Sequence, residues 1–448
     1  MNADIKPLRT ATETALATAF AARRATMPAG KIAKERDAAF ARFERTGLPT
    51  RRVEQWKYTD LRALMRDAKP LALPPDQATI ERAKSAGSIL PGIIAHRLVF
   101  VDGTFVPELS EQATFPGVRV YSLASEIERG NGAGAFTVAV KEAAEDSVVA
   151  LNSAMAVDGV VIQIAANTIV ERPIHLVFVY SGTEATAAFT RSRVVVEAGA
   201  QVTLVESHEG VNGIAYQVNT ALALFVGDRA VVNYIKVNHE GDASLHVATL
   251  TASIGTGSVL RSFAFTLDGA VTRNQLFVTC NGKNAELTIA GANLLRKREH
   301  ADTTLMLDHA VGGCTSREIF KSVLDDESRG VFQGKIVVRP DAQKTDARMM
   351  MRALLLSDDA EANHKPELEI FADDVQCGHG STAGALDPNL KFYLMARGIS
   401  EPEAEALLIQ AFVGEALDTI AHDGVRDALM FAALRWLGER AHMGEVRR

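Results

Sequence analysis

The chain has 448 residues, of which 47% are apolar and 23% are charged, so its composition is that of a globular protein with a sizeable core rather than of a disordered chain. The net charge is −7 and the basic residues are spread along the sequence, which argues against a nucleic-acid-binding protein with a basic stripe. Residues 1–7 contain no basic-then-apolar signal region, and no run of roughly eighteen apolar residues occurs. We therefore expect a cytoplasmic protein that binds neither nucleic acid nor a membrane.

Residues 1–95 are expected to form an N-terminal helical region. Between Ile32 and Arg45 the apolar residues recur mostly at helical spacing, which predicts a helix. Gly47 and Pro49 follow as the expected stop, because glycine accepts a left-handed cap and proline cannot continue the helix.

The pattern changes near residue 96, and residues 96–384 are interpreted as a β core. Two short apolar runs flank Asp102-Gly103, a dipeptide typical of tight hairpin turns. Further along the chain, four segments share a strand, a glycine turn and a second strand; their turn glycines are Gly199, Gly227, Gly255 and Gly282. Successive glycines in this series are separated by 28, 28 and 27 residues.

A near-constant period with a turn in each repeat indicates the stacked coils of a β-solenoid, in which each coil buries its apolar face against its neighbours. An ordinary β-sandwich with coincidental spacing is the alternative that this pattern leaves open. If the glycines mark equivalent turns, four residues that follow them should stack inside one core; these are Val202, Val231, Val259 and Leu287.

Residues 385–448 are expected to form a C-terminal helical region. Asp387-Pro388 predicts a helix start, with aspartate as the cap and proline in the first turn. Ser400 and Glu403 have the spacing of a capping box ahead of an apolar stretch. In the helix that follows, we expect one apolar face to pack internally; it consists of Leu407, Leu408 and Phe412.

Little in the sequence indicates catalysis. The stretch from Gly330 to Ile336 resembles a phosphate-binding loop, but it is one residue short between its glycines and lacks the hydroxyl that would contact magnesium. Three carboxylate pairs occur in the β core; they are Asp325-Asp326, Asp358-Asp359 and Asp373-Asp374. On a solenoid such pairs fit the acid and base of a polysaccharide lyase or hydrolase. Because adjacent residues of a strand point to opposite faces, we interpret the pairs as turns and keep the enzyme as the alternative.

The segment richest in candidate ligands is Cys377-Gly378-His379-Gly380. A thiol and an imidazole two residues apart share one face of a strand, and both suit iron or zinc. A buried free cysteine beside a histidine in a turn is the structural alternative. The other cysteines are Cys280 and Cys314, and there is no Cys-x-x-Cys pair, so the chain lacks the roughly four cysteine-type ligands of a standard iron–sulfur cluster. Any metal role is therefore expected to be partial or shared with another subunit.

From His309 to Leu417 the sequence resembles the SufB/SufD family of iron–sulfur cluster assembly proteins. The motifs that carry the resemblance occur in the family's order; they are Val331-Phe-Gln-Gly-Lys-Ile, Asp341-Ala-Gln-Lys-Thr-Asp-Ala, Pro366-Glu-Leu-Glu-Ile, Asp373-Asp-Val-Gln-Cys-Gly-His-Gly and Phe392-Tyr-Leu-Met-Ala-Arg-Gly-Ile. Near the N-terminus, Trp56-Lys-Tyr-Thr resembles a signature of the SufD branch. Gly378 stands where that branch often has serine, which changes the local stiffness without removing a ligand.

The resemblance implies a mostly β protein with a right-handed parallel β-helix core and helical N-terminal and C-terminal regions. It also implies a non-catalytic scaffold subunit of the SUF complex, which assembles with SufB and the ATPase SufC. A homodimer is an expectation for the isolated subunit.

The resemblance further implies which residues contact metal and partners. His379, with Cys377 beside it, is implied as a cluster-assembly residue at the SufB interface. The C-terminal helical region is implied to dock SufC, and we expect contacts there from Tyr393, Arg397, Gly398 and Ile399. The iron–sulfur cluster is then transient cargo of the complex and not a cofactor that this chain holds alone. Reduced flavin is linked to the family's complex as well, although the sequence contains no flavin motif.

Overall fold

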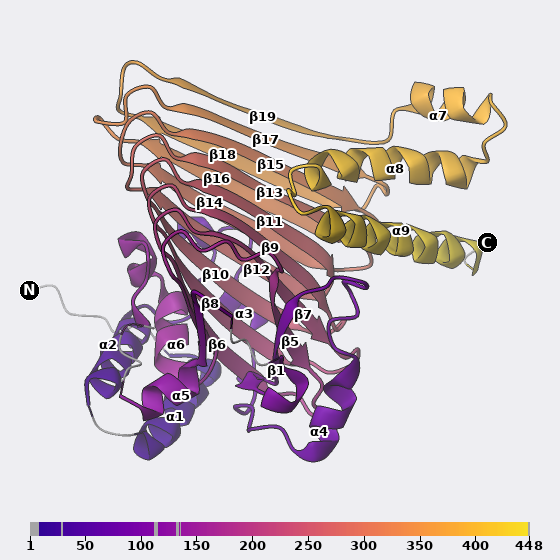
Figure 1. Cartoon of the computed structure of the whole chain (residues 1–448). Coiled ribbons are helices and arrows are strands. Elements are labelled where there is room, and N and C mark those ends of the chain that lie inside the picture. The colour runs from indigo at the N-terminus through magenta and orange to yellow at the C-terminus, as the bar shows by residue number, and fades with distance from the viewer. Residues whose placement is uncertain (1–8, 28–29, 112–114, 131–133, 135, 447–448) are drawn as a thin grey trace, which may run out of the picture.

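The structure is a computed structural model that describes residues 9–27, 30–111, 115–130, 134 and 136–446. Two sheets run through it, one of ten strands and one of nine (Figure 1). From β4 onward, successive strands alternate between the two sheets, and each strand pairs in parallel with the strand two places further along the chain. This topology is a parallel β-solenoid, as predicted, and it excludes the β-sandwich alternative because sandwich sheets are antiparallel.

The strands are mostly ten residues long. In sheet order, the ten-stranded sheet comprises β19 (Gln376–Gly384), β17 (Asp346–Leu355), β15 (Thr315–Leu324), β13 (Glu286–Leu295), β11 (Val259–Asp268), β9 (Val231–Glu240), β7 (Gln201–Gly210), β5 (Ile174–Tyr180), β1 (His96–Val101) and β2 (Thr104–Phe105). The nine-stranded sheet comprises β18 (Glu361–Ile370), β16 (Arg329–Val338), β14 (His300–His309), β12 (Val271–Cys280), β10 (Leu245–Ile254), β8 (Gln217–Val226), β6 (Ala187–Val196), β4 (Val160–Ile164) and β3 (Val118–Ser122).

Residues in register on neighbouring strands of a sheet stack in columns through the coils. One buried interior column comprises Val202, Val232, Leu260 and Leu287. The predicted column is therefore right for Val202 and Leu287 and wrong for Val231 and Val259. Val231 and Val259 pair with each other and lie one residue out of register with the interior column, so they belong to the outward face of their strands.

The error arises because the turn glycines are not equivalent. Gly199 has a φ of 69° and precedes Val202 by three residues, and Gly257, with a φ of 61°, precedes Leu260 by three. Gly227 and Gly255 instead precede the interior residues Val232 and Leu260 by five residues, so they lie two residues earlier in the turn than Gly199 and Gly257 do. A Cβ at either position would lie 2.8 Å from a backbone nitrogen of the neighbouring coil's turn. Glycine is thus required at one position for its left-handed conformation and at the other for close approach of two backbones.

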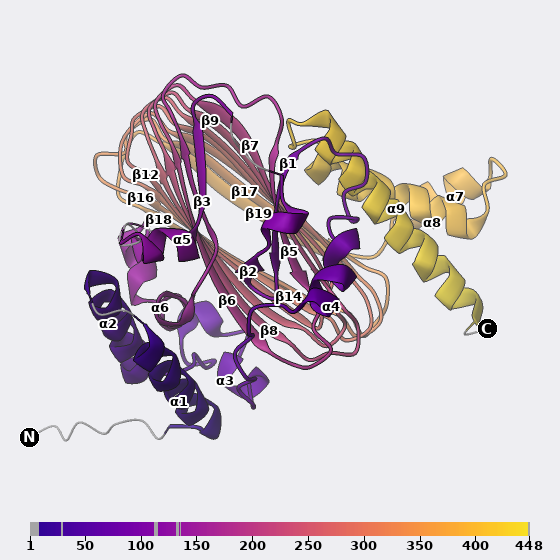
Figure 2. The ribbon, with the colours of Figure 1, turned by 60° about the horizontal axis from the view of Figure 1, so that its bottom comes forward.

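The helices before the long strands are α1 (Ala11–Thr26), α2 (Lys31–Thr46), α3 (Leu61–Leu64), α4 (Gln77–Arg82), α5 (Leu123–Glu128) and α6 (Ser147–Met155). Helices α1, α2 and α6 cover the outer face of the nine-stranded sheet, whereas α4 packs on β1 and β5 of the ten-stranded sheet (Figure 2). Helix α2 contains the predicted helix and ends at Gly47, which has a φ of 69°. The predicted hairpin is also confirmed: β1 and β2 are antiparallel around Asp102-Gly103, both of which have positive φ.

The Trp56-Lys-Tyr-Thr segment packs this N-terminal region against the solenoid. Trp56 is buried, and the guanidinium carbon of Arg273 on β12 lies 4.5 Å from the centroid of its ring. Arg273 forms a fully buried ion pair with Asp302 on β14, and the hydroxyl of Thr59 donates to the same carboxylate. These extra contacts offset the desolvation cost of a buried pair, so the residues of this signature have a structural role here.

The C-terminal helices are α7 (Pro388–Met395), α8 (Glu401–Leu417) and α9 (Asp423–Val446). Helices α8 and α9 cover the outer face of the ten-stranded sheet, whereas α7 lies beside α8 and has no buried residue (Figure 1). Asp387 caps α7 by accepting hydrogen bonds from two backbone N–H groups. Ser400 and Glu403 form the predicted capping box at the start of α8. In the part of the chain that the structure describes, none of the helices has the length and apolar character needed to cross a membrane.

The apolar face of α8 differs from the predicted one. Leu407 is 46% exposed, and Leu408 and Phe412 are only half-buried. The buried face instead includes Ile409 and Val413, which pack on outward-facing residues of the ten-stranded sheet. Leucine, isoleucine and valine occur on several sides of this helix, so periodicity alone does not select the buried side.

Candidate functional site

The last coil of the solenoid leaves the interior exposed at one end. Strand β18 ends the nine-stranded sheet and β19 ends the ten-stranded sheet (Figure 1). Both strands are described throughout, and none of their residues is buried. On the neighbouring β17, by contrast, Met349 and Met351 are 1% and 0% exposed. We call the inward face of this last coil the mouth; it includes His364 and Leu368 on β18 and Cys377, His379 and Ser381 on β19.

Cys377 and His379 lie on the same inward face of β19. In the register with β17, Cys377 pairs with Ala347 and His379 with Met349, and both partners belong to the interior core. Cys377 packs against this core, whereas His379 is exposed. A Cβ at Gly378 would meet no atom within 4 Å, so the backbone between thiol and imidazole is unshielded. Burial raises the pKa of the Cys377 thiol, so it is protonated at neutral pH in the isolated chain.

A second histidine lies at the mouth that the sequence analysis did not single out. The imidazole Nδ1 of His364 lies 2.8 Å from the hydroxyl oxygen of Ser381, which links β18 to β19 across the coil. His364 pairs with the buried Phe332 of β16, so it faces inward. Burial lowers the pKa of His364, which keeps the ring neutral and its lone pair available at pH 7. His364 precedes His379 by about half a coil, which places the two histidines on the two strands of one coil. This spacing is the sequence signal that could have found His364.

Deeper in the solenoid, a group of charged residues is buried; it comprises Glu206, His208, Lys236, Glu240 and His246. Glu206 and Glu240 each contact a histidine, at 2.7 and 2.5 Å from nitrogen to oxygen. Burial alone would raise the pKa of Glu206, but the hydrogen bond from His208 and the charge of Lys236 hold it at about 2. Burial lowers the pKa of Lys236 to about 8. The acids, the amine and the imidazoles thus pair with one another, except that Oε1 of Glu240 is buried without a hydrogen-bond partner, and we assign this group to packing.

Sequence comparisons identify the family. The profile of the SUF system FeS cluster assembly, SufBD core domain matches residues 178–412, and the profile of the SufBD protein N-terminal region matches residues 12–176. The chain belongs to the SufBD family. The iron–sulfur cluster assembly protein SufD of Escherichia coli is 31% identical over 86% of this chain and 88% of its own length. An iron–sulfur cluster assembly SufBD family protein of Synechocystis is 32% identical over 83% and 84%, and SufD of Bacillus subtilis is 28% identical over 64% and 66%.

As a SufBD protein, the chain is an iron–sulfur cluster assembly component, and the match to the core profile includes the whole mouth and α7. Helix α7 has no buried residue, and Phe392 and Tyr393 on it are 71% and 53% exposed. Arg397 lies over the ring of Tyr393, with 3.4 Å between guanidinium carbon and ring centroid. Gly398 follows with a φ of 88°, and the half-buried Ile399 leads into α8. The four residues expected to contact a partner therefore lie within residues 393–399, on one mostly exposed segment.

The carboxylate pairs lie in turns, as the sequence analysis predicted, and not on the strands of a catalytic groove. Asp325-Asp326 and Asp358-Asp359 lie in two turns at one side of the solenoid, and Asp373-Asp374 lies in the turn before β19. Asp325 is paired with Arg440, and Asp374 with Lys344. A cavity of about 560 Å³ beside α2 is lined by other residues, so in the described part of the chain no pair faces it. This arrangement gives the polysaccharide-enzyme alternative no support.

Proposed function

We propose that this SufBD protein is a non-catalytic scaffold subunit of a SUF complex, in which SufB contacts the mouth and the ATPase SufC contacts α7. The observation that carries the proposal is the mouth, where the solenoid interior ends without a cover and displays a thiol and two imidazoles. Repeat proteins need a polar cap at each end, and unpaired edge strands attract further strands. A second solenoid that stacks on β18 and β19 meets both requirements.

The ligand set at the mouth supports a shared assembly site. Cys377, His379 and His364 together supply fewer than the roughly four ligands that a cluster needs. A partner subunit that stacks on the mouth would add the remaining ligands and exclude water. The iron–sulfur cluster is cargo in this proposal, and no resident cofactor is assigned to the isolated chain.

The proposal assigns the chain no chemical step of its own. Its contribution is to hold imidazole nitrogens and a thiol in fixed positions while other subunits supply ATP hydrolysis, iron and sulfide. An exposed apolar helix such as α7 suits the contact with an ATPase, because the rings of Phe392 and Tyr393 remain 71% and 53% exposed, the latter with Arg397 over it.

The test is a His379→Ala substitution in the co-expressed complex. Because His379 is exposed and has no core contact to lose, the fold and the assembly of subunits should be unchanged. Cluster yield, measured as absorbance, iron and acid-labile sulfide, should fall at least about tenfold, since one ligand of a shared site is lost. His239→Ala, which removes a partly exposed histidine from the outward face of β9, is the matched control. Wild-type cluster yield from the His379→Ala complex would refute the placement of the site.

A further inference from the structure

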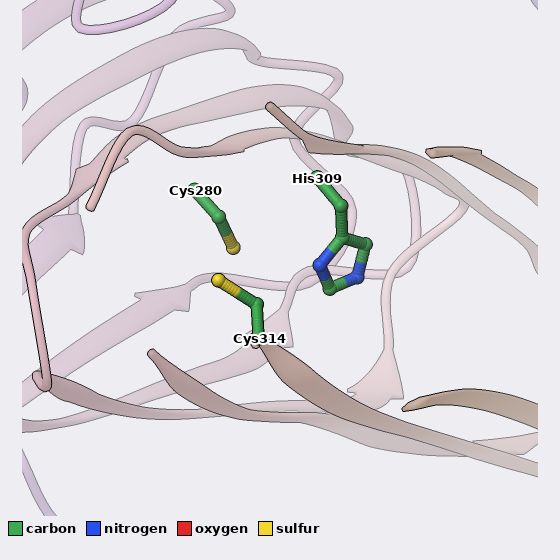
Figure 3. A group of neighbouring side chains, drawn as sticks. All are labelled: Cys280, His309 and Cys314. Atoms are coloured by element: carbon green, nitrogen blue, oxygen red, sulfur yellow. The ribbon is translucent and has the colours of Figure 1, made fainter. Parts of the chain in front are cut away.

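Three side chains from two neighbouring coils meet inside the solenoid. Cys280 at the end of β12, His309 at the end of β14 and Cys314 in the turn before β15 each offer a ligand atom, and these atoms all lie within 4.8 Å of one another. All three residues are 0% exposed. In Figure 3 the two sulfur atoms point toward each other, and one ring nitrogen of His309 faces them. This is the only such triad of His, Cys, Asp or Glu residues in the described part of the chain.

Packing alone does not explain the residue types. Cys280 and His309 are register partners in one interior column, and the other members of that column are aliphatic: Val196, Val226, Ile254 and Val338. The other coils in this column therefore carry a branched hydrocarbon side chain at the position of Cys280 and His309. An imidazole costs free energy at such a position unless both of its nitrogens have partners.

The hydrogen bonding of His309 leaves one nitrogen available. Its Nε2 lies 3.1 Å from the hydroxyl oxygen of Ser316, while its Nδ1 is buried and has no hydrogen-bond partner. If Nε2 carries the proton and donates to Ser316, Nδ1 presents a lone pair toward the sulfurs. A hydrogen bond from the far nitrogen commonly orients metal-binding histidines, and a buried nitrogen without a partner is destabilising.

We propose that Cys280, His309 and Cys314 bind one thiophilic divalent cation, of the class of Zn²⁺ or Fe²⁺, inside the solenoid. Two thiolates and one imidazole are the soft and borderline donors that such ions prefer. Two thiolates also cancel the charge of the ion, which lowers the desolvation cost of burying the site. Three protein ligands leave a fourth coordination position for an exchangeable ligand.

The site is close to the mouth. Ser316, which holds His309, belongs to an interior column that continues through Ala347 to Cys377. Two strand spacings separate Ser316 from Cys377, a distance of about 10 Å. The ring of His309 therefore lies about two coils from the exposed end of the interior. The inference concerns ion binding by this chain alone and does not depend on the proposed assembly with partners.

The test uses the full-length chain, reduced and freed of metal under anaerobic conditions. Co²⁺ serves as the spectroscopic probe and Zn²⁺ as the probe for stoichiometry by elemental analysis. The wild-type chain should bind one ion at this site and show thiolate-to-cobalt charge-transfer absorbance. Cys280→Ser and Cys314→Ser should each lose that absorbance and weaken binding by at least about a hundredfold. Val259→Ser, a substitution on the outward face of β11 and away from both the triad and the mouth, should leave both ion-binding readouts unchanged.

Three results would overturn the inference. The first is that the wild-type protein shows no charge-transfer absorbance, and the second is that either serine variant binds Co²⁺ as tightly as the wild type does. The third is a native Cys280–Cys314 disulfide that persists when reductant and Zn²⁺ are supplied. If the serine variants do not fold, differential alkylation of the wild-type chain decides. Zn²⁺ should slow modification of Cys280 and Cys314 relative to chelator, and equal rates with and without Zn²⁺ would contradict the site.

Discussion

His175 on β5 couples stability to pH at the scale of a single residue. Its side chain is buried, and its Nε2 lies 2.8 Å from the hydroxyl oxygen of Ser207. Burial, together with the nearby charge of Arg97, lowers the pKa of His175 to about 3. The folded pKa lies below the ordinary value of 6.5, so the neutral ring stabilises the fold fully above pH 6.5. That contribution is lost as the pH falls from 6.5 toward 3.

We expect His175→Gln to flatten this dependence. Between pH 7 and pH 5 the wild-type chain should lose roughly 2 kcal/mol of unfolding free energy through this residue, and the glutamine variant should lose less by about that amount. Urea unfolding at several pH values measures the difference. Between pH 7 and pH 8 the two proteins should have the same slope, which serves as the internal control. Parallel curves from pH 7 down to pH 5 would show that His175 is not buried as a neutral ring.

The residue scale also shows what the sequence can predict about the sites. The spacing of Cys377 and His379 predicts one shared strand face, but only the register with β17 shows that this face points inward. Cys280 and His309 are 29 residues apart, which is one coil, so an exact coil register would have predicted their contact. The glycine period did not supply that register, because the turns differ in length from coil to coil.

At the scale of single elements, α7 is the contact that we expect SufC to use. Phe392→Ser removes an aromatic side chain that is 71% exposed, so the stability of the isolated chain should change by less than about 0.5 kcal/mol. Co-purification with SufC should fall at least about tenfold if this ring is an interface anchor. Phe431→Ser on α9 removes a ring that is 52% exposed and serves as the control. If both variants lose SufC to the same extent, or both retain it, the proposed contact between SufC and α7 is wrong.

Point substitutions suit this question better than deletion of the C-terminal region. Helices α8 and α9 bury apolar side chains against outward-facing residues of the ten-stranded sheet, including Phe263 and Phe265. Deleting the helices would expose that surface, and lost binding could then reflect aggregation. The sequence predicted that these helices exist and where they begin, since caps are local signals. It did not predict which side of α8 is buried, because that depends on the sheet it covers.

At the scale of the whole molecule, coverage of the solenoid is uneven. Helices α1, α2 and α6 cover the outer face of the nine-stranded sheet and α8 and α9 that of the ten-stranded sheet, while the last coil has no cover in the described chain (Figure 1). The repeat predicted the solenoid from sequence, because coil stacking imposes a period. That one end stays uncovered is a property of the assembled fold, and no local pattern indicates it.

Strand alternation at the mouth allows a matched test of stacking. Ser381 and Thr382 are adjacent on β19, but Ser381 pairs with the interior Met351, whereas Thr382 pairs with Arg352 on the outward face. A lysine that points inward at an edge strand opposes strand pairing, because its charge would be buried in the joint. We therefore expect Ser381→Lys to dissociate SufB, or a second copy of this chain, from the mouth, and Thr382→Lys to leave assembly unchanged. Light scattering of the purified complexes measures both, and SufC bound at α7 should remain in either variant. If Thr382→Lys disrupts assembly as strongly as Ser381→Lys, the partner contacts the outer surface of the sheet and not the end of the solenoid.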